Sequence, residues 1–153
     1  MPPGSRPRRP VRLSASPNHV LKVEAMNLNQ VTLPSTDVAR SIAFYRRLGF
    51  ELIVASAPRY ARFACPDGGA TLSVHHVEQA PGDSHTVIYF ECEQLDQKVA
   101  QLKADGVLFA SDPVDQDWLW REATLLDPDG NRLCLYHAGQ NRRDPPWRVT
   151  ASA

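Results

Sequence analysis

Side chains that could recognise or modify a small molecule recur at alternating positions of several short, β-type segments. Two carboxylates, Glu91 and Glu122, and one thiol, Cys134, stand among aromatic residues there. The other members of this set are Gln30, Tyr60, Arg62, His75, Tyr89, Trp120 and Tyr136. Carboxylates pair with cations, aromatic rings stack on flat groups, and imidazole and thiolate groups bind metals or act as nucleophiles. The set predicts a ligand-binding pocket.

No catalytic residue can be assigned from these residue types alone. Cys134 lies in the middle of an apolar segment with no third group to orient a partner base, which is typical of a small buried residue. His75 and His76 are adjacent, so a strand directs them to opposite faces, and only His75 can face the pocket. There it is either a general base or a histidine hydrogen-bonded at the pocket rim.

The sequence Trp118-Leu-Trp-Arg-Glu122 is the most unusual local feature. Strand parity places Trp120 and Glu122 on the pocket face, where the ring can stack on an aromatic or cationic group and the carboxylate can pair with a positive charge. Alternatively, Trp118 and Trp120 fill a subunit or inter-module interface. Because unpaired buried carboxylates are costly, we expect an ion pair from Arg62 to Glu91 or Glu122 in the ligand-free protein.

The segments that carry these residues form two copies of one unit. In each copy a strand is followed by an amphipathic helix that ends at a glycine, Gly49 or Gly106, and then by three strands. The predicted strands are 28–33, 50–54, 59–64 and 70–77 in the first copy, and 86–92, 107–109, 119–126 and 132–137 in the second. This order predicts an α+β fold of two tandem βαβββ modules. The modules should form a curved, eight-stranded mixed sheet around a cup, with both helices on its convex face.

Length and composition predict one globular domain. The chain has 153 residues, 42% of them hydrophobic, and 17 basic against 17 acidic residues, so no basic field favours nucleic acid or an anionic membrane. No apolar run approaches the roughly 18 residues that span a bilayer. Three cysteines at unrelated spacings indicate neither disulfides nor a zinc motif, so a cytoplasmic location is expected.

The predicted boundaries follow from composition and from the repeat. The folded domain is expected at 26–138, with module one at 27–77 and module two at 84–138. Residues 1–25 are rich in arginine and proline and are predicted to be a disordered or non-native extension. Residues 139–153 are predicted to be a C-terminal tail.

The chain resembles the vicinal oxygen chelate superfamily, which includes glyoxalase I, bleomycin-resistance proteins and extradiol dioxygenases. The resemblance covers 27–138. It rests on the repeat and on Gln30-Val-Thr-Leu33, Ser41-Ile-Ala-Phe-Tyr45, Leu48-Gly-Phe50, Asp127-Pro-Asp-Gly-Asn131 and Leu133-Cys-Leu-Tyr136. It implies the βαβββ fold and a homodimer. It leaves the activity open, because this fold hosts both metal enzymes and metal-free drug binders.

The metal ligands of the superfamily's enzymes would fall, by this resemblance, on Gln30, Ser73, Val87 and Cys134. A glutamine oxygen and a thiolate are usable ligands, but serine is a poor one and valine cannot coordinate an ion. The resemblance therefore predicts that the usual metal site is lost and that the protein binds a small molecule without it.

Two other functions remain open at this stage. One is a lyase, isomerase or dioxygenase-type enzyme in which Gln30, His75 and a cup carboxylate hold a divalent Zn, Ni, Mn or Fe ion. His85 is a further candidate ligand, two residues before Val87. The other is an interaction subunit that binds no small molecule.

Overall fold

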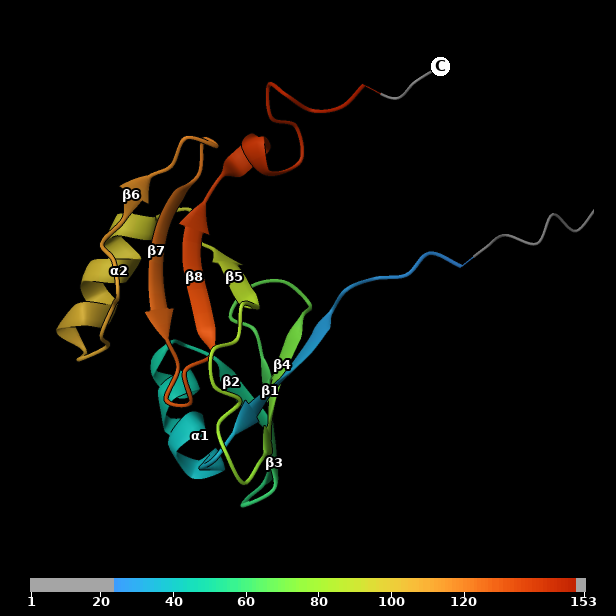
Figure 1. Ribbon diagram of the computed structural model, residues 1–153, viewed down its shortest axis with the longest axis vertical. Coiled ribbons are helices and arrows are strands. Elements are labelled where there is room, and N and C mark those ends of the chain that lie inside the picture. Colours follow the sequence, from blue (N-terminus) through green and yellow to red (C-terminus); the bar gives the residue numbers. More distant parts are fainter. Residues whose placement is uncertain (1–23, 151–153) are drawn as a thin grey trace, which may run out of the picture.

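The structure is a computed structural model that describes residues 24–150, so most of the predicted extension lies outside the described residues. The first module contains β1 (Gln30–Ser35), α1 (Val38–Arg47), β2 (Glu51–Ser56), β3 (Tyr60–Ala64) and β4 (Thr71–His76). The second contains β5 (Val87–Glu91), α2 (Leu95–Ala104), β6 (Val114–Asp115), β7 (Arg121–Leu126) and β8 (Arg132–His137), followed by the 3-10 helix η1 (Gly139–Arg142). The two modules lie one above the other along the long axis of the molecule (Figure 1). None of the helices in the described part is long and apolar enough to cross a bilayer.

The two modules have the same strand topology. Their sheets have the orders β1-β4-β3-β2 and β5-β8-β7-β6, and in each the first and last strands of the module pair in parallel. This confirms the predicted α+β fold of tandem βαβββ modules. The eight strands form two four-stranded hydrogen-bonded sheets, because β1 and β5 are each an edge strand that pairs on one side only.

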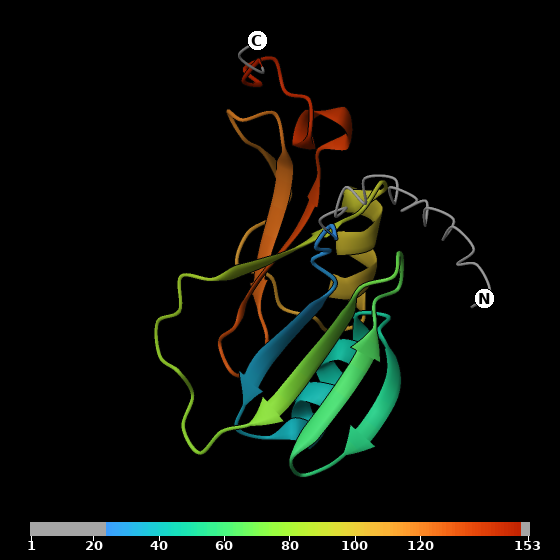
Figure 2. The ribbon, with the colours of Figure 1, turned by 90° about the vertical axis from the view of Figure 1, so that its right-hand side faces the viewer.

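One core joins the modules. In the first, α1 lies behind its sheet (Figure 2) and buries Tyr45 against Phe50 and Phe63, with ring centroids 5.6 and 5.5 Å apart. Phe50 also meets Phe90 of the second module edge to face at 5.3 Å. Burial of large rings is the main source of packing energy in such a core, so the two modules stabilise each other.

A polar clasp also links the modules. Asp129, in the turn between β7 and β8, accepts hydrogen bonds from the amide and hydroxyl of Thr36 at 2.8 and 2.6 Å. Ser41 and Arg40 of α1 contact the same carboxylate at 3.3 Å each. The helix itself begins after Asp37, whose side chain accepts a hydrogen bond from the Arg40 amide and so caps the helix.

Asp127 forms a second buried centre in this turn. Its carboxylate accepts from the Tyr45 hydroxyl at 2.7 Å, from the amides of Asp129 and Asn131, and from the Asn131 side chain. The side chain of Asn131 also donates to the Pro34 carbonyl in the first module. The Asp127-Pro-Asp-Gly-Asn131 turn therefore does more than reverse the chain, since it fixes one module against the other.

The strand predictions for 107–109 and for the start of 119–126 are wrong. Val107 is buried, but its amide closes the end of α2 by donating to the Leu102 carbonyl, and no strand follows until β6. Leu119 has φ +65° within a turn between Gln116 and Trp120, so β7 begins only at Arg121. Left-handed backbone does not fit a strand.

Candidate functional site

The exposed face of the first sheet carries a connected polar cluster. Arg62 donates from Nε to the Tyr60 hydroxyl at 2.8 Å, and this hydroxyl lies 2.6 Å from the Ser73 hydroxyl. Gln30 donates to Ser73 at 2.6 Å and accepts from Thr71. We call Gln30, Tyr60, Arg62, Thr71 and Ser73 the first-sheet cluster. Ser73, which is fully buried, is its centre.

The environment of Tyr60 favours its ionised form. The hydrogen bond with Ser73 lowers the pKa of Tyr60, and although partial burial opposes this, the Arg62 guanidinium lowers it further. His75 lies beside this cluster, opposite Tyr60 in the β3–β4 register, and its side chain is exposed. The cluster is therefore a polar surface with one guanidinium and no carboxylate.

The predicted ion pair between Arg62 and a cup carboxylate is wrong. Arg62 lies in the first sheet and is engaged by Tyr60, whereas both carboxylates belong to the second sheet. Glu91 accepts from the amides of Ala138 and Gly139 at 3.2 and 2.9 Å, and Arg142 of η1 lies 3.5 Å from it. Burial alone would raise the pKa of Glu91, but these amide hydrogen bonds and the Arg142 charge lower it overall.

Three aromatic rings gather on the open face of the second sheet. Trp120 stacks on Tyr136, with centroids 4.6 Å apart and planes 22° apart. Tyr89 stands edge-on to both rings, at 5.9 and 5.6 Å. Its side chain is 49% exposed, so it forms the open edge of this group. We call Tyr89, Trp120 and Tyr136 the aromatic cluster. Strand parity predicted that these three side chains lie on the same face of the sheet. The β5–β8 register confirms this for Tyr89 and Tyr136.

A buried carboxylate lies beside the aromatic cluster. Glu122 pairs with Tyr136 in the β7–β8 register, and it is only 8% exposed. Its Oε1 accepts from the indole Nε1 of Trp118 at 2.8 Å. The left-handed Leu119 separates the two tryptophans, so that one bonds the carboxylate while the other stacks on Tyr136. The sequence did not reveal this use of Trp118.

Cys134 is held in its thiol form. It is almost fully buried, and burial together with the nearby Glu122 charge raises the pKa of Cys134 to about 12. Because only the thiolate is nucleophilic, this environment suits a packing residue rather than a nucleophile.

We expect Cys134 in the native protein to resist alkylation by iodoacetamide at pH 8, since about one thiol in 10,000 is ionised four pH units below its pKa. Cys65, which is half-buried and not inside a sheet, should react faster. Peptide mapping by mass spectrometry after timed labelling measures both rates. Labelling of Cys134 at the rate of Cys65 contradicts this assignment.

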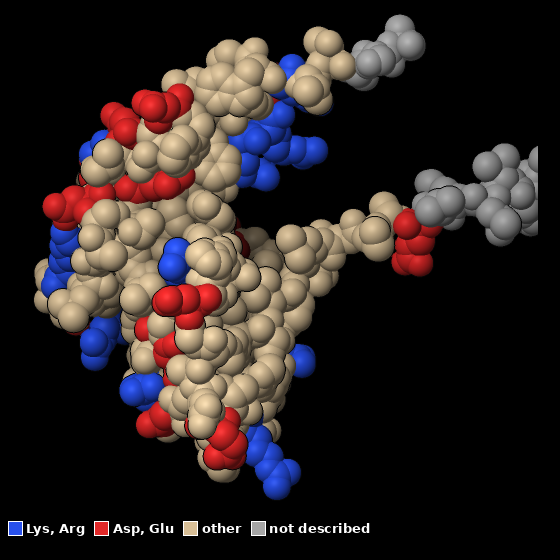
Figure 3. All heavy atoms as spheres, viewed as in Figure 1, with Lys and Arg blue, Asp and Glu red and all other residues tan. Residues whose placement is uncertain are grey.

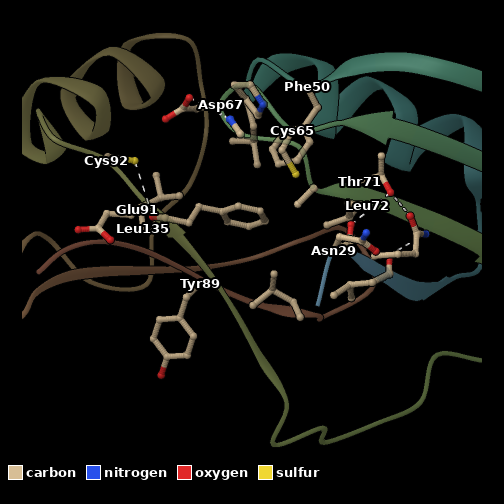
Figure 4. A pocket seen from close by; sticks show the side chains of 18 of the residues that line it. Asn29, Phe50, Cys65, Asp67, Thr71, Leu72, Tyr89, Glu91, Cys92 and Leu135 are labelled. Atoms are coloured by element: carbon tan, nitrogen blue, oxygen red, sulfur yellow. Dashed lines mark hydrogen bonds between the residues drawn. The ribbon is translucent and has the colours of Figure 1, made fainter. Parts of the chain in front are cut away.

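A cleft of about 600 Å³ lies between the two sheets, along the facing edges of β1 and β5. Figure 4 shows Thr71 at one end and Glu91 at the other, with Tyr89 on the same strand as Glu91. Gln30 lies with Thr71 on the first-sheet side, whereas most of the lining is apolar. The surface is also hollowed between the segment after β8 and the segment before β1 (Figure 3). Of the predicted site residues, Gln30, Tyr89 and Glu91 line this cleft. The residues outside its lining are Tyr60, Arg62, His75, Trp120, Glu122, Cys134 and Tyr136.

The residues present do not fit the superfamily's metal site. Of the positions that the resemblance implies, Gln30 and Ser73 bind each other, Val87 has no donor atom and Cys134 keeps its proton. Gln30 pairs with Thr71 while His75 lies four positions further along β4, a separation of about 13 Å at roughly 3.3 Å per residue. They cannot share an ion. Within residues 24–150, no three His, Cys, Asp or Glu side chains converge as a metal site.

Comparisons with known proteins agree with this fold. The chain is 31% identical over 110 residues to an uncharacterised protein of Mycolicibacterium smegmatis, covering 71% of this chain and 91% of that protein. The crystal structure of a glyoxalase/bleomycin resistance protein/dioxygenase from Nocardioides aligns with a TM-score of 0.68 at 21% identity, covering 85% and 93% of the two chains. A bleomycin-binding protein in complex with bleomycin aligns with a TM-score of 0.60 at 26% identity, covering 74% and 98%.

The family model covers most of the folded part of the chain. The model of one superfamily matches residues 27–135, which include every strand of both modules except the last two residues of β8. The chain therefore belongs to the glyoxalase/bleomycin resistance protein/dioxygenase superfamily.

Proposed function

We propose that this protein binds a small molecule with a flat aromatic group in the region between its two sheets, without the divalent ion of the superfamily's enzymes. The observation that carries the proposal is the aromatic cluster, in which Tyr89 is half-exposed, Trp120 is partly buried and Tyr136 is buried. The accessible ring surface of Tyr89 and Trp120 gives a flat ligand contact area with little loss of side-chain entropy.

The donor groups support the metal-free form of this proposal. The two remaining ligand-type positions are a glutamine engaged by Ser73 and Thr71 and a thiol with a pKa of about 12, and neither favours a divalent ion. The solved bleomycin complex shows that one protein with this fold and 26% identity binds bleomycin. In this protein the first-sheet cluster supplies hydrogen-bonding groups for the polar part of the ligand.

The proposal concerns the domain at 26–138 predicted from the repeat. A homodimer and a cytoplasmic location remain predictions, the first from the family resemblance and the second from cysteine usage.

Protein purified with its affinity tag removed and without chelators tests the proposal. We expect metal well below one ion per chain by elemental analysis. Flat aromatic compounds should raise Tm by several degrees with and without EDTA, because a ligand at 100 times its Kd stabilises the folded state by about 2.7 kcal/mol.

Two outcomes contradict the proposal. Near-stoichiometric Zn, Ni, Mn or Fe, with ligand stabilisation that disappears on chelation, favours a metal-dependent lyase, isomerase or dioxygenase-type enzyme. No stabilisation by any aromatic compound across the screen favours an interaction subunit.

A further inference from the structure

Glu122 is a buried carboxylate whose charge is not balanced by the protein around it. The side chain is 8% exposed and has one hydrogen bond, from Trp118. Among the described residues no ion pair includes Glu122. Removing a carboxylate from water without a cationic partner is costly, so the folded protein maintains a site of negative potential here.

Two arginines of this half of the chain, Arg121 and Arg142, are engaged by other carboxylates. Arg121 immediately precedes Glu122 at the start of β7 and forms ion pairs with Asp96 and Asp115, at 2.9 and 3.1 Å. Arg142 lies against Glu91. Neither is available to neutralise Glu122 without breaking an ion pair. The negative charge also acts on its surroundings: after burial and the effect of Cys134, Glu122 contributes to raising the pKa of Tyr89.

The aromatic cluster, like Glu122, favours a positively charged ligand. The faces of Trp and Tyr rings carry negative electrostatic potential and attract cations within about 6 Å of the centroid. Tyr136 lies opposite Glu122 in the β7–β8 register, and Trp120 stands two residues before Glu122, just ahead of β7. Tyr89 is the exposed member of the group. A carboxylate and aromatic rings together attract organic cations and repel anions.

We propose that the ligand is a planar organic cation, such as a quaternary or protonated heteroaromatic nitrogen compound, whose charge is held by Glu122 and whose ring packs on Tyr89 and Trp120. This inference rests on the proposed function and specifies its ligand class. The positive charge of the ligand neutralises the Glu122 carboxylate, and the aromatic rings exclude water from this ion pair. Trp118 keeps Glu122 oriented through its indole hydrogen bond.

Three probes of similar shape and different charge test this class. N-methylquinolinium is a cation, 1-naphthylmethanol is neutral and 1-naphthoate is an anion. Each is titrated into the full chain at pH 7.5, and the indole N–H signals of Trp118 and Trp120 are followed by NMR. We expect the cation to bind at least about 10-fold more tightly than the neutral probe, a difference of about 1.4 kcal/mol, and the anion to bind most weakly.

The Glu122→Gln variant isolates the carboxylate, because the amide has nearly the same shape and its oxygen can still accept from Trp118. We expect it to lose the preference for the cation while binding the neutral probe within about two-fold of the original protein. Glu51→Gln is the matched control, since Glu51 is an exposed acid on β2 of the other sheet. It should leave all three affinities unchanged.

The outcomes separate this inference from the proposed function. Equal affinities for the cation and the neutral probe, or a preference that survives Glu122→Gln, overturn the ligand class but leave aromatic binding intact. No binding of any probe overturns the proposed function and this inference together. The ratio of affinities in the unaltered protein decides the question if Glu122→Gln does not fold.

Discussion

Replacing Asp129 by alanine is expected to lower the free energy of unfolding by about 3 kcal/mol, and Tm by about 10 °C. The equivalent replacement in the first module, Asp67→Ala, should cost less than about 0.5 kcal/mol. Both residues occupy the same place in a Pro-Asp-Gly turn, so local turn chemistry is matched between the two variants. The difference between the two losses in free energy of unfolding measures how much the contacts of Asp129 with the first module contribute to stability.

The physical reason is the number of groups that Asp129 satisfies. Its side chain is 1% exposed and accepts from the Thr36 amide and hydroxyl, with Arg40 and Ser41 at 3.3 Å. Removing it leaves buried donors without a partner and weakens the contact between modules. Asp67 is exposed, and its only side-chain hydrogen bond within residues 24–150 is to the adjacent Gly68 amide.

Chemical denaturation of both variants at pH 7 measures these free energies of unfolding.

The pH dependence of the free energy of unfolding provides a second test, with Asp129→Asn. Burial opposes ionisation, but the hydrogen bonds from Thr36 and the charge of Arg40 lower the pKa of Asp129 below its usual value. The folded state then binds the proton less readily than the unfolded state, so this stabilisation is present above about pH 4 and is lost as the pH falls through the folded pKa. The gap between the original protein and Asp129→Asn should therefore narrow on acidification. Equal destabilisation by Asp67→Ala and Asp129→Ala contradicts a clasp.

Replacing Trp120 by alanine is expected to weaken aromatic ligand binding about 100-fold, a loss of roughly 2.7 kcal/mol. Trp120 carries the largest ring system of the aromatic cluster, and it both stacks on Tyr136 and meets the edge of Tyr89. Its removal takes away the largest contact surface and leaves Tyr89 with one aromatic neighbour in place of two. Any aromatic compound found to stabilise the protein serves as the ligand in this measurement.

Calorimetric titration of the folded variant gives the affinity, with a thermal unfolding curve to confirm that the domain is intact. Trp147→Ala is the matched control, since Trp147 is 56% exposed, follows η1 and has no ring contact with Tyr89, Trp120 or Tyr136. It should change affinity by less than about two-fold. An unchanged affinity in Trp120→Ala, or an equal loss in Trp147→Ala, shows that the ligand lies elsewhere.

Much of the architecture could be predicted from local patterns. Alternation of apolar residues identified the face of each strand that receives a helix, and Leu33, Phe63 and Leu133 are buried on that face as expected. Glycines ended both predicted helices, and Gly49 and Gly106 have positive φ. The short β6 was missed because its two residues pair only with β7 and carry no pattern of their own.

The partners of charged side chains could not be predicted in this way. Parity placed Arg62, Glu91 and Glu122 on open faces, and a favourable ion pair between opposite charges was the expected result. The structure instead assigns each to a neighbour in its own module: Tyr60, the amides after β8, and Trp118. Which groups meet depends on distances between sheets, and sequence spacing does not contain these distances.

The sequence by itself determined the duplicated fold and the superfamily, because periodicity and turn residues are local properties. Only the tertiary structure decided that Asp129 joins the modules, that Trp118 rather than Arg62 holds Glu122, and that His75 lies too far from Gln30 to share an ion. Each of these depends on the packing of segments distant in sequence or on a backbone turn such as that at Leu119. Such contacts arise from the whole fold and are not encoded in any one stretch of the chain.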